Sequence, residues 1–337
     1  MSKRSITTEK PFSEVLTALF TNTTVPIQDL YRLSDMSAEE TVEFETRWPD
    51  VDDERRRVIA RHMADLTEDN YVVDFSPAFG FMLQDPAAAV RLAALDGMWD
   101  STSTSLITPI THLLQEDEST EVRAAAAAAL AHYVLMAEWG QLPRPISARL
   151  VKVLLAEYDK PDTPTAVKRA ALEAMSAANH PRIEELILSA YHSGDFENQL
   201  SAVFAMGRSA DARWLPTVLD EMENDEPNMQ LEAARAAGTI GEERAVPLLA
   251  RLVLSEEMAV ALTAVHALGQ IGGDTASRVL TTLLDDPEFE RLHDAAGEAL
   301  EEMDWLGGNL GVGSFLDEFD DDDYFDEDDD RDYLVYH

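Results

Sequence analysis

Cysteine is absent from the 337-residue sequence. This absence excludes disulfide bridges, thiolate zinc sites and cysteine nucleophiles. The sequence also has no apolar run of about 20 residues, the length that a membrane-spanning helix requires. The first ten residues are polar and unlike a secretion signal. We therefore expect a cytoplasmic protein that does not enter a membrane.

Basic residues are also scarce, with 26 lysines and arginines against 65 aspartates and glutamates, which gives a net charge of −39. Residues 317–337 hold 12 of the acids and one of the bases, which leaves 53 acids and 25 bases in residues 1–316. A field of this sign repels nucleic-acid phosphates and anionic lipid headgroups, so we expect neither as a partner. The charge serves either solubility or the selection of a basic partner protein.

Internal repetition is the strongest pattern in the sequence. Three alanine-rich segments align without gaps at a period of 31 residues, each ending in a glycine: Gly207, Gly238 and Gly269. Three leucines keep the same spacing: Leu200, Leu231 and Leu262. The register extends upstream to residue 90 and downstream to residue 293, with an insertion around residues 139–146 whose glycine and prolines indicate a loop. Seven copies are therefore expected between residues 85 and 306.

Each copy has the pattern of two helices. In the first helix, small residues such as Ala93, Ala94 and Gly97 recur at helical spacing, which allows a neighbouring helix to come close. In the second helix, larger apolar residues share one face, and a proline such as Pro216 falls in the first turn, where its missing N–H costs little. The predicted fold class is all-α, a right-handed α-α superhelix of about seven repeats of about 31 residues.

Two segments resemble a known family. Residues 85–95, DPAAAVRLAAL, and residues 244–252, RAVPLLARL, resemble HEAT repeats of the bacterial phycobilisome-lyase-like type. The resemblance covers about residues 85–303 and implies a HEAT-like solenoid. It implies little about function, because this superfamily includes scaffolds, chromophore lyases, a DNA glycosylase and a di-iron hydroxylase.

The flanking segments differ from the repeats. Residues 1–84 are expected to form an N-terminal helical cap from a degenerate repeat, with a capping box at residues 37–40 and an amphipathic helix over residues 52–66. The basic cluster at residues 55–57 is expected on a solvated helix face. Residues 307–337 are expected to be a glycine linker followed by an acidic, disordered tail.

The eight histidines do not form the pattern of a catalytic or metal site. Di-iron hydroxylases of the superfamily place His-Glu pairs on their repeats, and this sequence has no His-Glu dipeptide. His266 lies between apolar residues of an alanine-rich helix, so we expect a packing residue. The acids of the tail lack the central glycine of a calcium loop. We expect no catalytic residue, no cofactor and no metal, and therefore a protein that is not an enzyme.

A binding surface remains as the expected function. In HEAT arrays the second helices line the concave side, and in this register four polar residues form a row there: Ser189, Asp220, Arg251 and Thr282. We expect a non-catalytic scaffold or adaptor that binds a protein or peptide on this surface, and the acidity favours a basic one. The alternative is an accessory or regulatory subunit of an enzyme complex, including lyase-type action on a cofactor-bearing protein. The partner's identity and the oligomeric state stay open.

The tail contains a second candidate motif. Five aromatic residues are interleaved with acids: Phe319, Tyr324, Phe325, Tyr333 and Tyr336. Disordered segments of this composition bind as linear motifs, because acids steer association and aromatics supply buried area. Three alternatives follow: the tail docks on a basic partner, folds back on its own array, or only solubilises the protein.

Overall fold

The computed structural model describes residues 10–69 and 73–311, and all regular structure in this part of the chain is helical. The predicted all-α solenoid is confirmed. The helices that precede the array are α1 (Phe12–Thr21), α2 (Ile27–Leu30), α3 (Ala38–Arg47), α4 (Asp53–Asp69) and α5 (Ser76–Met82).

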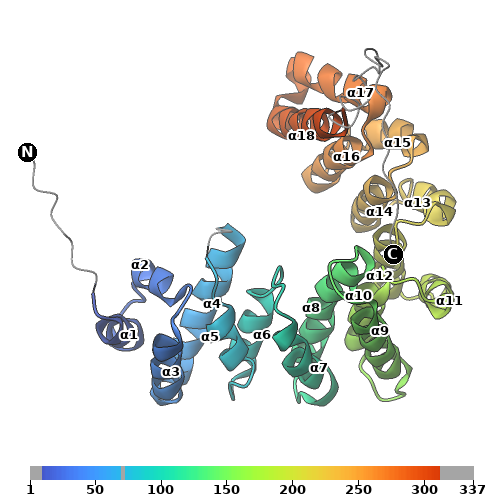
Figure 1. Cartoon of the computed structure of the whole chain (residues 1–337). Coiled ribbons are helices and arrows are strands. Elements are labelled where there is room, and N and C mark those ends of the chain that lie inside the picture. The colour runs from blue at the N-terminus through green and yellow to red at the C-terminus, as the bar shows by residue number, and fades with distance from the viewer. Residues whose placement is uncertain (1–9, 70–72, 312–337) are drawn as a thin grey trace, which may run out of the picture.

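Pairs of helices then follow one another along the chain (Figure 1). The first helices of the pairs are α6 (Ala88–Asp96), α8 (Thr120–Glu138), α10 (Thr165–Met175), α12 (Phe196–Arg208), α14 (Pro227–Ile240), α16 (Met258–Ile271) and α18 (His293–Gly311). The second helices are α7 (Ile107–Glu116), α9 (Arg144–Asp159), α11 (Pro181–Tyr191), α13 (Leu215–Glu221), α15 (Val246–Leu252) and α17 (Gly273–Asp285). The first helices lie where the 31-residue register predicts them.

The repeated glycines are the points where successive first helices touch. A Cβ atom on Gly207 of α12 would lie 2.6 Å from Cα of Ala236 in α14. A Cβ atom on Gly238 would lie 2.9 Å from Cα of Ala267 in α16. Real Cβ atoms do not approach a backbone this closely, so the period in the sequence records a helix contact that has room only for hydrogen.

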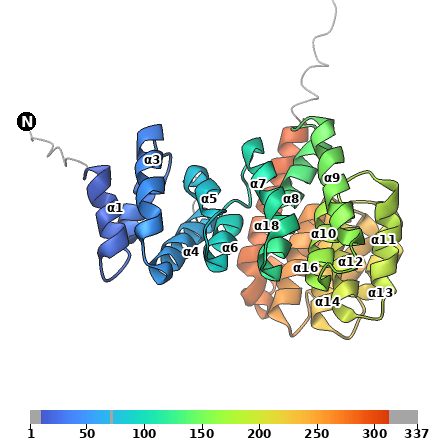
Figure 2. The same ribbon diagram turned by 90° about the horizontal axis from the view of Figure 1, so that it is seen from below.

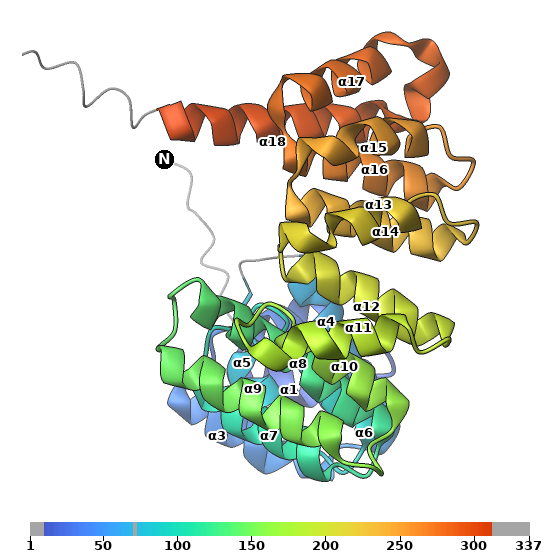
Figure 3. The same ribbon diagram turned by 90° about the vertical axis from the view of Figure 1, so that its right-hand side faces the viewer.

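The two rows of helices lie on opposite sides of a curved array. The first helices pack against one another from α8 to α18, whereas neighbouring second helices touch little. In Figure 1 the array forms an arch, with α8, α10, α12, α14 and α16 on its inner side and α11, α13, α15 and α17 on its outer side. Figure 3, turned to face that outer side, shows α11, α13, α15 and α17 in front of α12, α14 and α16. The expectation that second helices line the concave surface is therefore wrong for this half of the chain.

The N-terminal helices continue the array at its other end (Figure 2). The predicted capping box of α3 is present: the Ser37 hydroxyl accepts a hydrogen bond from the Glu40 N–H, and the Glu40 carboxylate accepts one from the Ser37 N–H. The indole of Trp48 is buried and donates to Oδ2 of Asp85, 2.8 Å away, at the start of the first repeat. The cap and the array therefore share a continuous core.

The basic cluster of α4 is solvated only at Arg57, which is exposed and paired with Asp53 and Glu54; for Arg55 and Arg56 the expectation is wrong. Arg56 is buried, with its Nη2 2.5 Å from Oδ1 of Asp53 and its Nε 3.4 Å from Oδ2 of Asp85. Arg55 donates to the carbonyl of Leu19. The sequence could not show the contacts with Leu19 and Asp85, because these two acceptors come from α1 and from the start of the first repeat.

The array ends in α18, which continues to Gly311. The glycine-rich segment predicted as a linker from residue 307 is therefore helical over its first five residues. The rest of the predicted tail, residues 312–337, lies outside the described residues, and so do its five aromatic candidates.

Candidate binding surface

The four residues predicted as a binding row are exposed, but they lie on the outer side of the arch. Ser189, Asp220, Arg251 and Thr282 belong to α11, α13, α15 and α17. Arg251 Nη1 is 2.8 Å from Oε1 of Glu223, and the Thr282 hydroxyl donates to the carbonyl of Arg278 in its own helix. Arg251 and Thr282 of the row therefore already bond within the chain.

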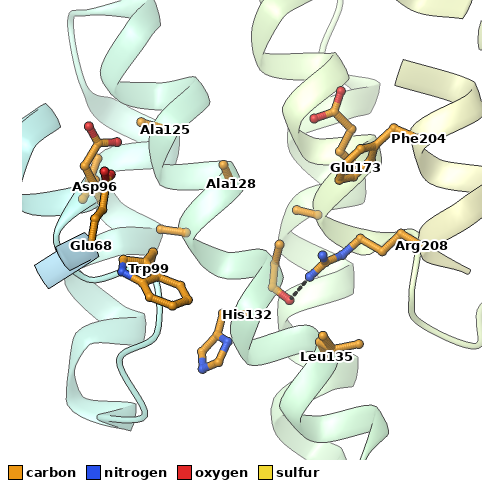
Figure 4. Close-up of a pocket in the computed structure, with 14 residues that line it drawn as sticks. Glu68, Asp96, Trp99, Ala125, Ala128, His132, Leu135, Glu173, Phe204 and Arg208 are labelled. Carbon is orange, nitrogen blue, oxygen red and sulfur yellow. Dashed lines mark hydrogen bonds between the residues drawn. The ribbon is translucent and has the colours of Figure 1, made fainter. Parts of the chain in front are cut away.

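A hollow of about 610 Å³ lies on the inner side, across α8 (Figure 4). Its walls come from the end of α4, from α6 and the turn after it, and from α10 and α12. Its floor is α8 itself. Ligand sites in proteins have volumes of this order, and they combine an apolar lining with a few polar groups.

The floor is unusual because α8 is apolar on both sides. The side that faces the core carries large buried residues such as Leu130, Tyr133 and Val134. The side that faces the hollow carries Ala128, which is exposed, and Ala125, which is half-buried. A surface helix normally presents polar residues to solvent. A helix that is apolar on its solvent side indicates a surface that another molecule covers.

Two rings stand at one end of the hollow. Trp99 follows α6 and is 45% exposed, and His132 of α8 lies beside it (Figure 4). Burial lowers the pKa of the His132 imidazole; the nearby Asp100 raises it, and Arg208 lowers it further. Burial therefore favours the neutral form of the imidazole. Trp99 and His132 together form a flat, largely apolar wall.

A carboxylate and a guanidinium stand at the other end. Glu173 of α10 accepts a hydrogen bond of 2.5 Å from the hydroxyl of Ser201, and among the described residues it has no ion pair. Burial raises the pKa of Glu173, and the Ser201 hydroxyl with the charges of Arg169 and Arg208 offsets only part of this shift. Arg208 of α12 donates instead to the carbonyl of Ala131, 3.3 Å away (Figure 4).

The sequence contains a pattern that marks this inner surface, and the prediction of the row from Ser189 to Thr282 is not based on it. Three residues of successive first helices lie three positions before the repeated glycines and therefore share their 31-residue period: Phe204, Arg235 and His266. Phe204 lines the hollow, and Arg235 and His266 are exposed further along the same side. His266 is thus a surface residue, and its expected packing role is wrong. The packing face of each first helix is so rich in alanine that the remaining polar positions mark the surface.

Other kinds of site are not formed by the described residues. Within residues 10–69 and 73–311, no group of three or more histidines, aspartates or glutamates is arranged to hold a metal ion. None of the described helices combines the length and the apolar character that crossing a bilayer requires.

Comparison with solved structures finds similar chains of low sequence identity. An engineered protein is 18% identical, with 87% of this chain and 88% of that chain covered and a TM-score of 0.38. The protein YibA of Escherichia coli is 15% identical, with 90% and 99% covered and a TM-score of 0.40. Human deoxyhypusine hydroxylase is 14% identical, with 87% and 96% covered and a TM-score of 0.34.

Comparison by sequence matches one part of the chain. No curated protein matches the chain. The family model described as HEAT repeats matches residues 215–301, which run from α13 into α18. The period and the paired helices agree with this match, which identifies HEAT repeats in residues 215–301.

Proposed function

We propose that the protein is a scaffold or adaptor that binds a segment of a partner protein on the inner side of its arch, in the hollow across α8. The observation that supports this most strongly is the solvent side of α8, where exposed Ala128 and its neighbours leave an apolar floor between the ring wall and Glu173. HEAT-type arrays bury little of their inner surface against themselves, so that surface is available to a partner.

Protein binding fits the hollow better than catalysis does. Its polar groups are few and stand at its ends, while the middle of its floor offers the methyl groups of Ala125, Ala128 and Ala129. A linear segment can lie across such a floor and reach both ends. The acidic body also favours a partner of opposite charge, because complementary fields raise the association rate.

The test compares the inner and outer surfaces in the full chain. Ala128→Glu places a charge on the floor without breaking α8, since glutamate is a good helix former. Thr282→Glu places the same charge on the outer row. A photo-crosslinking amino acid placed at position 125 should trap a partner that Ala128→Glu releases and Thr282→Glu retains. The reverse pattern would move the binding surface to the outer row and reject this proposal.

The same experiment addresses the alternative role. The absorbance spectrum of the crosslinked partner separates a cofactor-bearing protein from one without a chromophore. A visible chromophore on a partner held in the hollow would favour the accessory role in an enzyme complex. A colourless partner would favour the scaffold.

A further inference from the structure

We propose that the hollow recognises one lysine or arginine side chain within an apolar segment of the partner, with Glu173 as its counter-ion. This inference depends on the function proposed above, because it specifies the chemistry of the segment that binds there. Glu173 pairs with the cation of the partner, and the hollow sets the spacing between that basic residue and an apolar residue of the same segment.

The charges around the hollow are paired at one end and unpaired at the other. Asp96 and Glu68 stand at the ring end and share Arg61, which lies 2.7 Å from Asp96 Oδ2 and 4.0 Å from Glu68 Oε1. Among the described residues, the one direct bond to Glu173 comes from the Ser201 hydroxyl, and Arg169 and Arg208 act on it as nearby charges without an ion pair. A partly buried carboxylate without a cation is unfavourable, and a cation brought by a partner would compensate it.

Arg208, the arginine that lines the hollow, leaves Glu173 available to a cation of the partner. Arg208 lines the hollow, but it donates to the Ala131 carbonyl, and it forms no ion pair with Glu173 or any other described carboxylate. A further carboxylate, Glu232 on α14, is neutralised by Arg235 at 2.6 Å. Glu68, Asp96 and Glu232 each have an ion pair with an arginine, whereas Glu173 has none in the described chain.

The apolar floor of the hollow suits a long basic side chain. Lysine and arginine have long methylene stems that lie along apolar surface while the charged end reaches a polar group. The alanines of α8, with Leu135 and Phe204, supply such a surface next to Glu173. An acidic partner residue is disfavoured, because the two nitrogens without a partner there, Nε of Arg208 and Nε2 of His132, are enclosed by protein atoms.

The arrangement also sets a spacing within the segment. Trp99 and Glu173 lie on opposite sides of α8 in Figure 4. A helix with its side chains is about 10 Å across, and an extended chain advances about 3.3 Å per residue. A segment that places an apolar residue against Trp99 should therefore carry its basic residue roughly three positions away.

The experiment selects ligands from random 12-residue peptides displayed against the full chain. Glu173→Gln is the test variant, because it removes the charge and keeps both the size and the bond to Ser201. Glu185→Gln is the matched control, because it removes one charge from the exposed face of α11. Wild type should enrich peptides with one lysine or arginine about three residues from an aromatic or large aliphatic residue. Their affinity should fall about tenfold or more in Glu173→Gln and stay within about twofold in Glu185→Gln.

A third variant tests the sign of the effect. Arg208→Gln removes a like charge near the incoming cation, so it should tighten binding of the same peptides several-fold, which a variant that merely loosens the fold would not do. Enrichment without basic residues, or equal affinity in wild type and Glu173→Gln, would overturn this inference. If those peptides are still displaced by Ala128→Glu, inner-side binding stands and only the basic specificity fails. If Ala128→Glu has no effect on them, the proposed function fails as well.

Discussion

Two glutamates inside the array differ in what surrounds their carboxylates. Glu157 of α9 is completely buried and receives hydrogen bonds from Arg123, from Lys160 at 2.6 Å and from Thr163 at 3.1 Å. Glu173 of α10 receives one hydrogen bond, from a neutral hydroxyl. The first group of contacts stabilises the repeat, whereas the second arrangement costs stability. Such a cost is typical of residues retained for binding.

The pH dependence of stability should reveal the structural role of Glu157. Burial raises its pKa, but the bonds from Lys160, Thr163 and Arg123 outweigh burial, and the pKa lies below the ordinary 4.5. A lowered folded pKa means stability that is present above the unfolded pKa and lost as the pH falls through the folded one. Glu157→Gln should therefore cost about 3 kcal/mol at neutral pH. Urea denaturation should show this difference shrinking below about pH 4.5; a difference independent of pH would contradict the assignment.

Glu173 should show the opposite behaviour. Its folded pKa is raised by burial, so the wild-type carboxyl loses stability as the pH rises from the unfolded value through the folded one. Glu173→Gln should be more stable than wild type at neutral pH, by about 1 kcal/mol. The two proteins should converge in acid, where both side chains are neutral. A neutral-pH loss of stability in the variant would show that Arg169 and Arg208 stabilise the carboxylate more than burial destabilises it.

The sequence could predict few of these residue-scale roles. Acids are so frequent that Glu173 looks like any other glutamate until burial distinguishes it. The buried pair of Arg123 and Glu157 joins residues 34 apart on two helices, and the pairing of Arg91 with Asp117 joins α6 to the segment before α8. The two residues of each pair meet because of how the helices pack, and the local sequence does not specify this packing.

At the scale of the helices, the sequence predicted more. A glycine that recurs every 31 residues within alanine-rich segments has a physical meaning, because a close helix contact tolerates no Cβ atom there. The positions of the first helices and the capping box of α3 followed from local patterns. The end of α18 did not: helix continues into a glycine-rich segment that local propensity would terminate.

Substitution of the contact glycine tests this explanation of the period. At Gly207, an added Cβ would lie 2.6 Å from Cα and 2.7 Å from Cβ of Ala236, so Gly207→Ala should destabilise the protein by about 1–3 kcal/mol. Gly297 of α18 is the control, because nothing lies within 4 Å of its added Cβ. Gly297→Ala should be neutral or stabilising by up to about 1 kcal/mol, since alanine is the better helix former. Thermal unfolding of both variants measures the contrast; equal shifts would mean that helix propensity decides both.

At the scale of the whole molecule, the direction of curvature could not be predicted from the sequence. Both helix rows are amphipathic, and the period is the same whichever row lies inside. The closer packing of the first helices decides the direction: small residues let them approach, while the bulkier second helices stay apart. The side on which the row from Ser189 to Thr282 lies depends on this direction, which is why its predicted concave position is wrong.

The net charge acts on the molecule as a whole. Surface ion pairs such as Arg182 with Asp159, at 2.7 Å, and Arg251 with Glu223, at 2.8 Å, are weakened by salt. Each such pair contributes less than about 1 kcal/mol. Residues 1–316 have 53 acids and only 25 bases, so most acids have no cation and repel one another. Repulsion among the acids therefore outweighs the attraction within the surface ion pairs, and salt weakens this repulsion as well.

We therefore expect added salt to stabilise the protein, although salt weakens its ion pairs. The Debye length is about 30 Å at 0.01 M salt and about 10 Å at 0.1 M, so most of the self-repulsion is screened over this range. The melting temperature should rise steeply between these concentrations and level off towards about 1 M, where the Debye length is about 3 Å. Sodium and potassium chloride should give the same curve, because screening depends on ionic strength and not on the cation. A melting temperature that falls with salt would show that the ion pairs outweigh the repulsion, and a rise specific to one cation would indicate a bound ion.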